Sequence, residues 1–406
     1  MIGFTEAVQK GILLLDGAMG TELQRAGLPA GAAPEVWNLS EPAKVEAIHR
    51  AYLEAGAEIL ETNTFGANPL KLAHYGLAEE VGPLNQAGVE LARRAASGGA
   101  WVVGSVGPTG RLLAPLGDLD PEEALRGYAL QAGALAAAGA DAINIETMSD
   151  MAEMRLALLG ALATGLPVMA EFVFERNGRT LFGSPPEVIG AFLAGFPVLA
   201  AGTNCGLTPE LLPPILEGLR KTWRGPLVAQ PNAGQAGDYL GAEEFAAAAA
   251  SLVERGATIV GGCCGTTPAH IARLRAELAP HRAALPPTGE AAPFLASRTE
   301  VRSLSALPAG ATVFVRDEGQ DLFAEALPYQ DAEAIVFDLT AVEMPPRRLG
   351  QVLAGLWPAL RPPAIFCASE PETLAAAILS YPGRPGAAGD PSLAEKAREL
   401  GALWLA

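Results

Sequence analysis

The chain has 406 residues, of which 50% are hydrophobic and 18% charged, and its formal net charge is −17. This length predicts two domains, and so apolar a composition excludes a disordered chain. The acidic balance, without any Lys/Arg cluster, argues against binding nucleic acid or an anionic membrane surface. No stretch has the length and apolarity of a membrane span or of the apolar core of an export signal. We therefore expect a cytoplasmic protein.

Short apolar runs alternate with longer helical patterns through roughly the first 280 residues, the usual size of a barrel domain. Eight runs are strand candidates, at 12–15, 58–61, 102–105, 142–145, 168–173, 199–203, 227–229 and 258–260. Helical patterns lie between them, notably at 42–55, 121–138, 151–163, 209–222 and 242–255. Capping residues beside first-turn prolines open several of these helices, and glycines close them.

Eight strand–helix units predict an α/β fold, a (β/α)8 TIM barrel over residues 1–282. An open doubly wound sheet has room for as many strands, but no G-x-G-x-x-G motif follows the first strand. Residues 283–296 are rich in Ala and Pro and are interpreted as a linker.

Residues 297–406 predict a smaller α/β domain. Its strand-like runs are 312–315, 334–339, 364–366 and 402–405, with helical patterns at 370–380 and 392–401. About four such units make half a barrel, which leaves sheet edges to be covered. The region is therefore expected to dock on the first barrel, to pair with another copy, or to form a small open sheet.

Three of the four cysteines follow predicted barrel strands. Cys205 comes after the sixth strand, and Cys263 and Cys264 come after the eighth. Catalytic groups of such barrels lie at the carboxyl ends of strands, and the sixth and eighth strands flank the seventh. Three converging thiolates can hold Zn²⁺ and leave its fourth position open. Unreactive buried thiols or a bond between the two adjacent cysteines are the alternatives.

Two carboxylates stand at the same predicted rim, Asp16 after the first strand and Glu146 after the fourth. They are candidates for holding a substrate ammonium group, for acid–base catalysis, or for capping neighbouring helices. Glycine-rich turns beside them offer backbone N–H groups to a substrate carboxylate. The four histidines fall in predicted helices or connections, so we do not expect them to be metal ligands.

The sequence resembles the homocysteine S-methyltransferase family, and within it the homocysteine-binding module of cobalamin-dependent methionine synthase. The resemblance rests on LLLDGAMGTELQRAG (13–27), AIHRAYLEAGAEILETNTFGAN (47–68), GSVGPTG (104–110), INIETMSD (143–150), TNCGLTPE (203–210), QPNAGQ (230–235) and GGCCGTTPAHI (261–271). It implies a zinc-dependent enzyme that methylates the homocysteine thiol to give methionine, with Cys205, Cys263 and Cys264 as catalytic zinc ligands. The substrate-binding residues that it implies are Asp16, Gly17, Ala18, Thr109 and Glu146. Asn204, at the end of the sixth strand, is a further candidate that could add a hydrogen bond.

The resemblance is compatible with more than one methyl donor. A methylcorrinoid/methyltetrahydrofolate system is our first interpretation, with methylcobalamin supplied by a corrinoid- or folate-binding partner protein. S-methylmethionine or S-adenosylmethionine comes second. Residues 297–406 resemble a truncated pterin-binding half barrel. They depart from that pattern near 313–317, and Cys367 replaces a usual aspartate.

Two other functions stay open. One is a non-catalytic thiol-binding or assembly subunit derived from a methionine synthase, which would keep the three cysteines. The other is a zinc-free barrel whose adjacent Cys263 and Cys264 are redox-active, in which case Cys205 would have no role.

Overall fold

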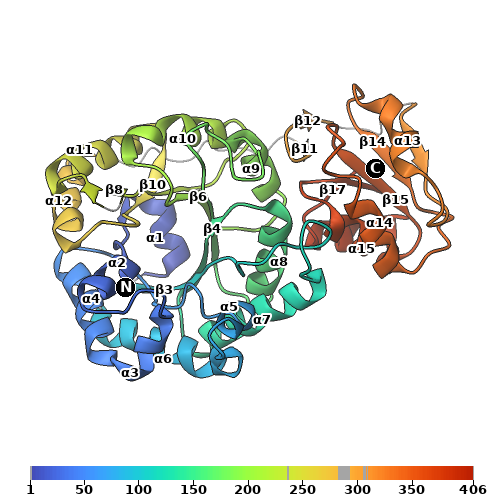
Figure 1. The fold of residues 1–406 in the computed structure, drawn as a ribbon. Coiled ribbons are helices and arrows are strands. Elements are labelled where there is room, and N and C mark those ends of the chain that lie inside the picture. Colours follow the sequence, from blue (N-terminus) through green and yellow to red (C-terminus); the bar gives the residue numbers. More distant parts are fainter. Residues whose placement is uncertain (1, 236, 282–292, 305–307, 309, 406) are drawn as a thin grey trace.

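The computed structural model describes residues 2–235, 237–281, 293–304, 308 and 310–405. It contains an eight-stranded parallel sheet closed into a barrel and a smaller five-stranded parallel sheet beside it (Figure 1). The predicted fold class is confirmed. The boundaries at 282 and 297 stay predictions, because most of the predicted linker lies outside the described residues. Its last part, Phe294–Ala296, forms strand β11.

The barrel strands follow the predicted apolar runs closely. They are β1 (Leu13–Leu14), β2 (Ile59–Glu61), β3 (Trp101–Val106), β4 (Ala142–Met148), β5 (Val168–Phe172), β6 (Ala200–Asn204), β7 (Leu227–Gln230) and β10 (Ala257–Val260). Their order in the sheet is β1-β10-β7-β6-β5-β4-β3-β2. A parallel bridge between Leu15 and Ile59 joins β1 to β2. The sheet therefore closes, and all its strands end at the same rim.

Helices surround the barrel as a ring (Figure 1). The α-helices are α2 (Met19–Arg25), α3 (Trp37–Ser40), α4 (Pro42–Glu54), α5 (Pro69–Ala73), α6 (Val81–Ala96), α7 (Pro121–Ala137), α8 (Met151–Leu162), α9 (Pro186–Leu193), α10 (Pro213–Arg220), α11 (Ala242–Ser251) and α12 (Pro268–Leu278). Short 3-10 turns are η1 (Pro34–Val36), η2 (Ala78–Glu80), η3 (Pro209–Leu211) and η4 (Leu252–Arg255). A small hairpin, β8 (Gly234–Gln235) and β9 (Asp238–Tyr239), follows β7.

The amino-terminal end of the barrel is closed by helix α1 (Phe4–Lys10), which the sequence pattern did not predict. Its Phe4, Ala7 and Val8 pack with a layer of apolar side chains inside the barrel, among them Val103 and Ile259. This plug leaves the opposite rim, where the strands end, as the open end of the barrel.

The second sheet has five strands where the sequence predicted four. They are β13 (Thr312–Phe314), β14 (Ile335–Asp338), β15 (Ala364–Ala368), β16 (Gly386–Gly389) and β17 (Leu403–Trp404), paired in that order. The unpredicted strand is β16, whose sequence Gly-Ala-Ala-Gly has low strand propensity. The other elements are β11 (Phe294–Ala296), β12 (Val301–Ser303), α13 (Leu322–Ala326), η5 (Leu327–Tyr329), α14 (Pro346–Ala354), α15 (Pro371–Ser380), η6 (Pro391–Leu393) and α16 (Ala394–Glu399).

The second region contacts the barrel along α8 and α9. Arg155 of α8 is fully buried and donates to the carbonyl oxygens of Leu400 and Gly383. Arg384 of the second region in turn reaches α9, where its Nη1 lies 3.4 Å from the Ala191 carbonyl oxygen. Two of the three expected arrangements therefore occur together, because the region docks on the barrel and its own sheet is small and open. None of the helices in the described residues combines the length and apolarity that crossing a bilayer requires.

Candidate functional site

The three predicted cysteines meet at the open rim. Their Sγ atoms all lie within 4.8 Å of one another, and those of Cys205 and Cys264 are 3.8 Å apart. A tetrahedral ion with sulfur ligands at about 2.3 Å holds the sulfurs about 3.8 Å apart. The cluster therefore fits a zinc ion. All four cysteines of the chain are free thiols, and Cys367 lies in β15 of the second sheet.

Local backbone geometry turns these sulfurs toward one another. Cys205 follows β6 with a φ of 58°, in the left-handed region that residues other than glycine seldom adopt. Its N–H donates to the Gln230 carbonyl oxygen of β7, 3.0 Å away. Cys263 donates in the same way to the Pro231 carbonyl oxygen at 2.8 Å. The seventh strand thus ties together the two loops that carry the thiols.

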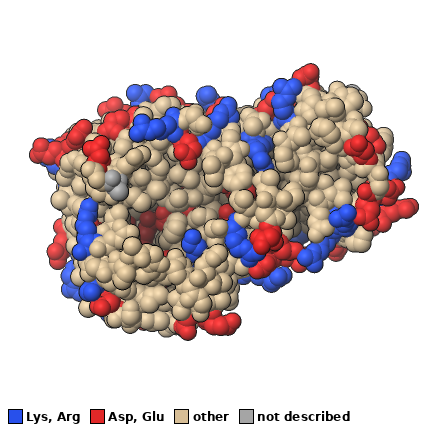
Figure 2. Space-filling model, viewed as in Figure 1, with Lys and Arg blue, Asp and Glu red and all other residues tan. Residues whose placement is uncertain are grey.

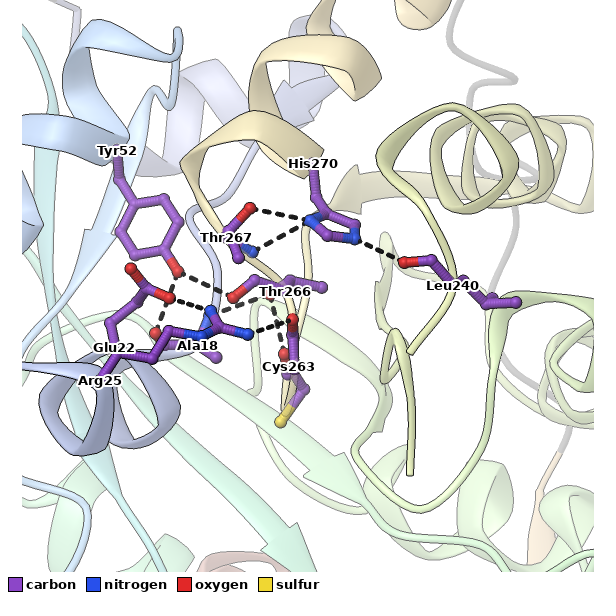
Figure 3. A network of polar contacts seen from close by, with 10 residues as sticks. Ala18, Glu22, Arg25, Tyr52, Leu240, Cys263, Thr266, Thr267 and His270 are labelled. Atoms are coloured by element: carbon purple, nitrogen blue, oxygen red, sulfur yellow. Dashed lines mark hydrogen bonds and ion pairs between the residues drawn. The ribbon is translucent and has the colours of Figure 1, made fainter. Parts of the chain in front are cut away.

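A second set of hydrogen bonds holds the loop after β10 against the loop after β1 (Figure 3). The Thr266 hydroxyl accepts from Ala18 N–H at 3.0 Å and donates to the Cys263 carbonyl oxygen at 2.8 Å. The Tyr52 hydroxyl donates to the Ala18 carbonyl oxygen at 2.9 Å. A Cβ at Gly17 would lie 2.7 Å from Thr266 Oγ1, so the close approach of the two loops requires glycine there.

Helix α12 starts at the end of this network. The Thr267 and His270 side chains form a reciprocal capping box, and His270 Nε2 lies 3.0 Å from the Leu240 carbonyl oxygen. The His270 side chain therefore caps helix α12 and links it to the segment that follows β9. Arg25 of α2 contacts Glu22 and, at 3.5 Å, the Gly265 carbonyl oxygen beside Cys264.

Proximity of the three thiols changes how they ionise. Hydrogen bonds from the Cys263 and Cys264 thiols lower the pKa of Cys205 to about 3. The same contact with Cys205 raises the pKa of Cys263 and brings that of Cys264 to about 11. The cluster therefore carries a thiolate at neutral pH, and that thiolate is the form that binds metal.

The carboxyl groups of four acidic residues lie within the barrel near this cluster: Asp16, Glu61, Glu146 and Glu171. Burial is the main cause that raises each pKa, to about 7 for Glu146 and to about 8 for Glu171. Repulsion between the carboxylates adds to this effect, as for Glu61, which feels the charges of the other three. A cation entering the barrel would relieve this repulsion, so the group favours a positively charged ligand.

Hydrogen bonds orient these carboxyl groups. Glu146 accepts from the Ser105 hydroxyl and from Asn204 Nδ2, the latter at 2.6 Å. Asn204 also accepts from Thr147 N–H at 2.8 Å, and Thr147 has a φ of 59°. One oxygen of Asp16 accepts from Glu61 N–H at 3.0 Å, while its Oδ1 is buried with no hydrogen-bond partner among the described residues.

A cavity of about 390 Å³ opens at this rim, and Figure 2 shows acidic side chains inside the hollow. Of the predicted site residues, Gly17, Ala18, Glu146 and the three cysteines line it. Ala18 uses both its N–H and its carbonyl oxygen within the loop network. Asn204 is buried behind Glu146, and Asp16 is bonded to the backbone of Glu61.

Thr109 does not line this cavity. Its N–H and its hydroxyl both donate to Glu153, at 2.8 and 2.7 Å. Its predicted role in substrate binding therefore stays a prediction without a contact to carry it. Glu61 and Glu171 were not among the predicted residues. A single acidic residue near the end of an apolar strand was the signal that could have found them.

The comparisons with known proteins agree with this geometry. The model of the homocysteine S-methyltransferase family matches residues 13–278. The chain is 35% identical over 314 residues to methionine synthase of Mycobacterium leprae, covering 70% of this chain and 26% of that protein. It is 36% identical over 303 residues to methionine synthase of Mycobacterium tuberculosis, covering 68% and 25%. The chain thus spans about a quarter of the length of these relatives.

Solved structures include close matches to the barrel. The metallated form of the homocysteine methyltransferase MmuM from Escherichia coli superposes with a TM-score of 0.56 at 32% identity. That match covers 65% of this chain and 96% of MmuM. Its oxidised form matches with a TM-score of 0.55 at the same identity. The family model covers well over half of the chain, and the chain therefore belongs to the homocysteine S-methyltransferase family.

Proposed function

We propose that this protein transfers a methyl group to the thiol of homocysteine, giving methionine, with Zn²⁺ held by Cys205, Cys263 and Cys264. The observation that carries the proposal is the convergence of the three sulfurs at the spacing of a tetrahedral ion. Bound zinc would leave a fourth position for the substrate sulfur and favour its thiolate form at neutral pH. The metallated form of the related MmuM supports a metal in this family.

The amino acid end of homocysteine is proposed to lie over the buried carboxyl groups. Glu146 lines the cavity together with Cys205 and Cys264, so one small molecule can reach both ends of the site. The ammonium group of homocysteine would supply the positive charge that the four buried carboxyl groups favour. Asp16, through its partnerless Oδ1, is the second candidate partner, and Asn204 positions Glu146.

The reaction needs few groups beyond these. A lone pair of the homocysteine sulfur forms the new S–CH₃ bond, and the electron pair of the broken bond leaves with the donor. The protein's residues hold the sulfur and the ammonium group in fixed positions and keep the nucleophile unprotonated. The thiol proton would be released to solvent as the substrate sulfur binds, so the methyl transfer itself requires no general base.

For the donor we propose a methylcorrinoid/methyltetrahydrofolate system carried by a partner protein, with S-methylmethionine or S-adenosylmethionine as the second candidate. Large apolar side chains surround the open rim and support a large donor. Phe65, Leu112, Leu181 and Tyr239, from the segments after β2, β3, β5 and β7, are 37%, 50%, 71% and 40% exposed. Exposed apolar groups gathered around a site are typical of an interaction surface.

The proposal is tested by measuring zinc content and methionine formation in one preparation, with homocysteine and each donor in turn. We expect about one zinc per chain, in keeping with one three-cysteine site. Cys264→Ala should lose most of the zinc and more than about 100-fold in rate, since even changes outside the ligand shell cost about 10–100-fold. Cys367→Ala, a thiol of the second sheet, is the matched control and should match the unaltered protein.

The same assay separates substrate binding from zinc binding. Glu146→Gln should keep its zinc and raise the KM for homocysteine about tenfold or more, because it removes one charged partner of the ammonium group. Zinc without turnover from any donor would favour the non-catalytic thiol-binding subunit. Absence of zinc, or a disulfide between Cys263 and Cys264 in mass spectra, would overturn the proposed chemistry.

A further inference from the structure

A second cavity, of about 890 Å³, lies between the barrel and the second region. Its barrel wall comes from the carboxyl-terminal end of α8 and the loop before β6, and its other wall from α16 and β17. Because α8 begins beside the open rim and the loop precedes β6, the cavity lies toward the amino-terminal end of the barrel. No described residue lines both this cavity and the cavity of the thiol site.

The lining of this cavity has two chemically distinct parts. Leu159, Leu162, Pro197, Leu403 and Trp404 supply an apolar surface that helix and sheet packing leaves partly exposed. Arg384 and Arg398, each with a guanidinium group, also line the cavity. Apolar walls with a few convergent polar groups, in a volume of about 300–1,000 Å³, are typical of small-molecule sites.

Neither arginine has an anionic partner among the residues that the structure describes. Within the described residues no ion pair joins either of them to a carboxylate, although acidic residues outnumber basic ones, 45 to 28. Arg384 is 9% exposed, and the one side-chain hydrogen bond that it makes to a described residue is a long contact of 3.4 Å from Nη1 to the Ala191 carbonyl oxygen. Glu399 also lines the cavity, but it is exposed and pairs with Lys396 at 3.3 Å.

An uncompensated guanidinium at this depth is energetically costly, and desolvation lowers the pKa of Arg384 to about 10. The backbone of Arg384 is nevertheless fixed. Its N–H donates to the Ala296 carbonyl oxygen at 2.8 Å, and its carbonyl oxygen accepts from Ala296 N–H at 2.9 Å. Gly195 closes the wall beside it, and a Cβ there would lie 3.1 Å from Arg384 Nε.

We propose that this cavity binds a small amphipathic anion, a carboxylate on an apolar chain or ring. The carboxylate would pair with Arg384 and Arg398, since guanidinium groups bind carboxylates through paired hydrogen bonds. The apolar body would lie on Trp404 and the leucines of α8. This site is separate from methyl transfer and does not depend on the proposed function.

Calorimetric titration of the full chain with octanoate, with homocysteine present at saturation, tests this site. We expect binding of about one octanoate per chain, and weaker binding by at least about tenfold for both 1-octanol and inorganic phosphate. 1-Octanol keeps the apolar chain without the charge, and phosphate keeps a charge without the apolar chain. Equal binding of 1-octanol would show a merely apolar cleft, and equal binding of phosphate a simple anion site; either result overturns the proposal.

Variants locate the binding. Arg398 is exposed, so Arg398→Gln should fold normally and weaken octanoate about tenfold, while Trp404→Leu should weaken it through lost apolar contact. Arg224→Gln, an exposed arginine on the barrel, is the matched control and should bind as the unaltered protein does. Unchanged affinity in both cavity variants, or no saturable binding at millimolar octanoate, would contradict the assignment.

Discussion

Glu171 illustrates how single residues inside the barrel make stability depend on pH. It is fully buried, accepts from Asn144 and Gln230 on one oxygen, and has a pKa of about 8, mainly because burial disfavours its charged form. In the unfolded chain its pKa returns to the ordinary 4.5. A raised carboxyl pKa gives stability that is present in full below pH 4.5 and is lost as pH rises through 8.

The Glu171→Gln variant should remove this dependence, because its amide stays neutral. We expect its melting temperature to fall less than that of the unaltered protein between pH 5 and pH 8, in the range set by the raised pKa. At pH 8 the free energy of unfolding of the unaltered protein should have fallen further than that of Glu171→Gln, by on the order of 3–5 kcal/mol at most. Glu244→Gln, on the exposed face of α11, is the control. If the melting temperatures of Glu171→Gln and of the unaltered protein changed equally with pH across this range, burial would not raise the pKa of Glu171 as proposed.

At the scale of elements, the loop after β10 depends on the loop after β1 through Thr266. Thr266→Val keeps the shape but leaves the buried Ala18 N–H without an acceptor. The Cys263 carbonyl oxygen keeps the hydrogen bond from Thr266 N–H, so the substitution mainly loosens the loop after β1. We expect about 1–3 kcal/mol of lost stability and roughly 10–100-fold weaker zinc binding. Chelator competition and urea unfolding measure the two effects.

Thr266→Ser is the matched control for this change, since its hydroxyl can make both hydrogen bonds. It should retain zinc at chelator concentrations that strip the valine variant. If valine and serine retained zinc equally well, the loop geometry would not depend on the hydroxyl network of Figure 3.

The elements also show what the sequence could predict. Apolar runs separated by glycine and proline residues located all eight barrel strands. The tendency of catalytic groups to lie at the carboxyl ends of strands placed the three cysteines at one rim. Strand β16 was missed because Gly and Ala give no strand signal without their neighbours. Helix α1 carries only three buried residues and too short a period to detect.

Contacts between segments that are distant in the sequence could not be predicted, for a different reason. Thr266 and Ala18 are separated by 248 positions, and no local pattern states that one accepts from the other. The same holds for Thr109, whose turn suggested substrate contact while its hydroxyl binds Glu153. A motif fixes which segments reach the rim, but packing decides which side chains of those segments face the cavity.

At the scale of the whole molecule, Arg155 joins the barrel to the second region. Its guanidinium carbon lies 5.4 and 5.6 Å from the ring centres of Phe192 and Phe196, and the group donates to two carbonyl oxygens of the second region. These carbonyls belong to Leu400 and Gly383, in the segments that flank β16 and β17. Burial lowers the pKa of Arg155 to about 9, so the charge itself is costly and its hydrogen bonds offset that cost.

Arg155→Met fills a similar volume but cannot donate to either carbonyl oxygen. Each carbonyl that loses its partner costs about 1–3 kcal/mol, and removal of the buried charge recovers part of this. We expect a net loss of about 2 kcal/mol at the junction. In scanning calorimetry the second region should unfold below the barrel as a separate transition, while the proposed zinc binding and methyl-transfer rate of the barrel stay unchanged. A single transition at an unchanged temperature would mean that the apolar contacts of α8 and α9 hold the two regions together without the arginine.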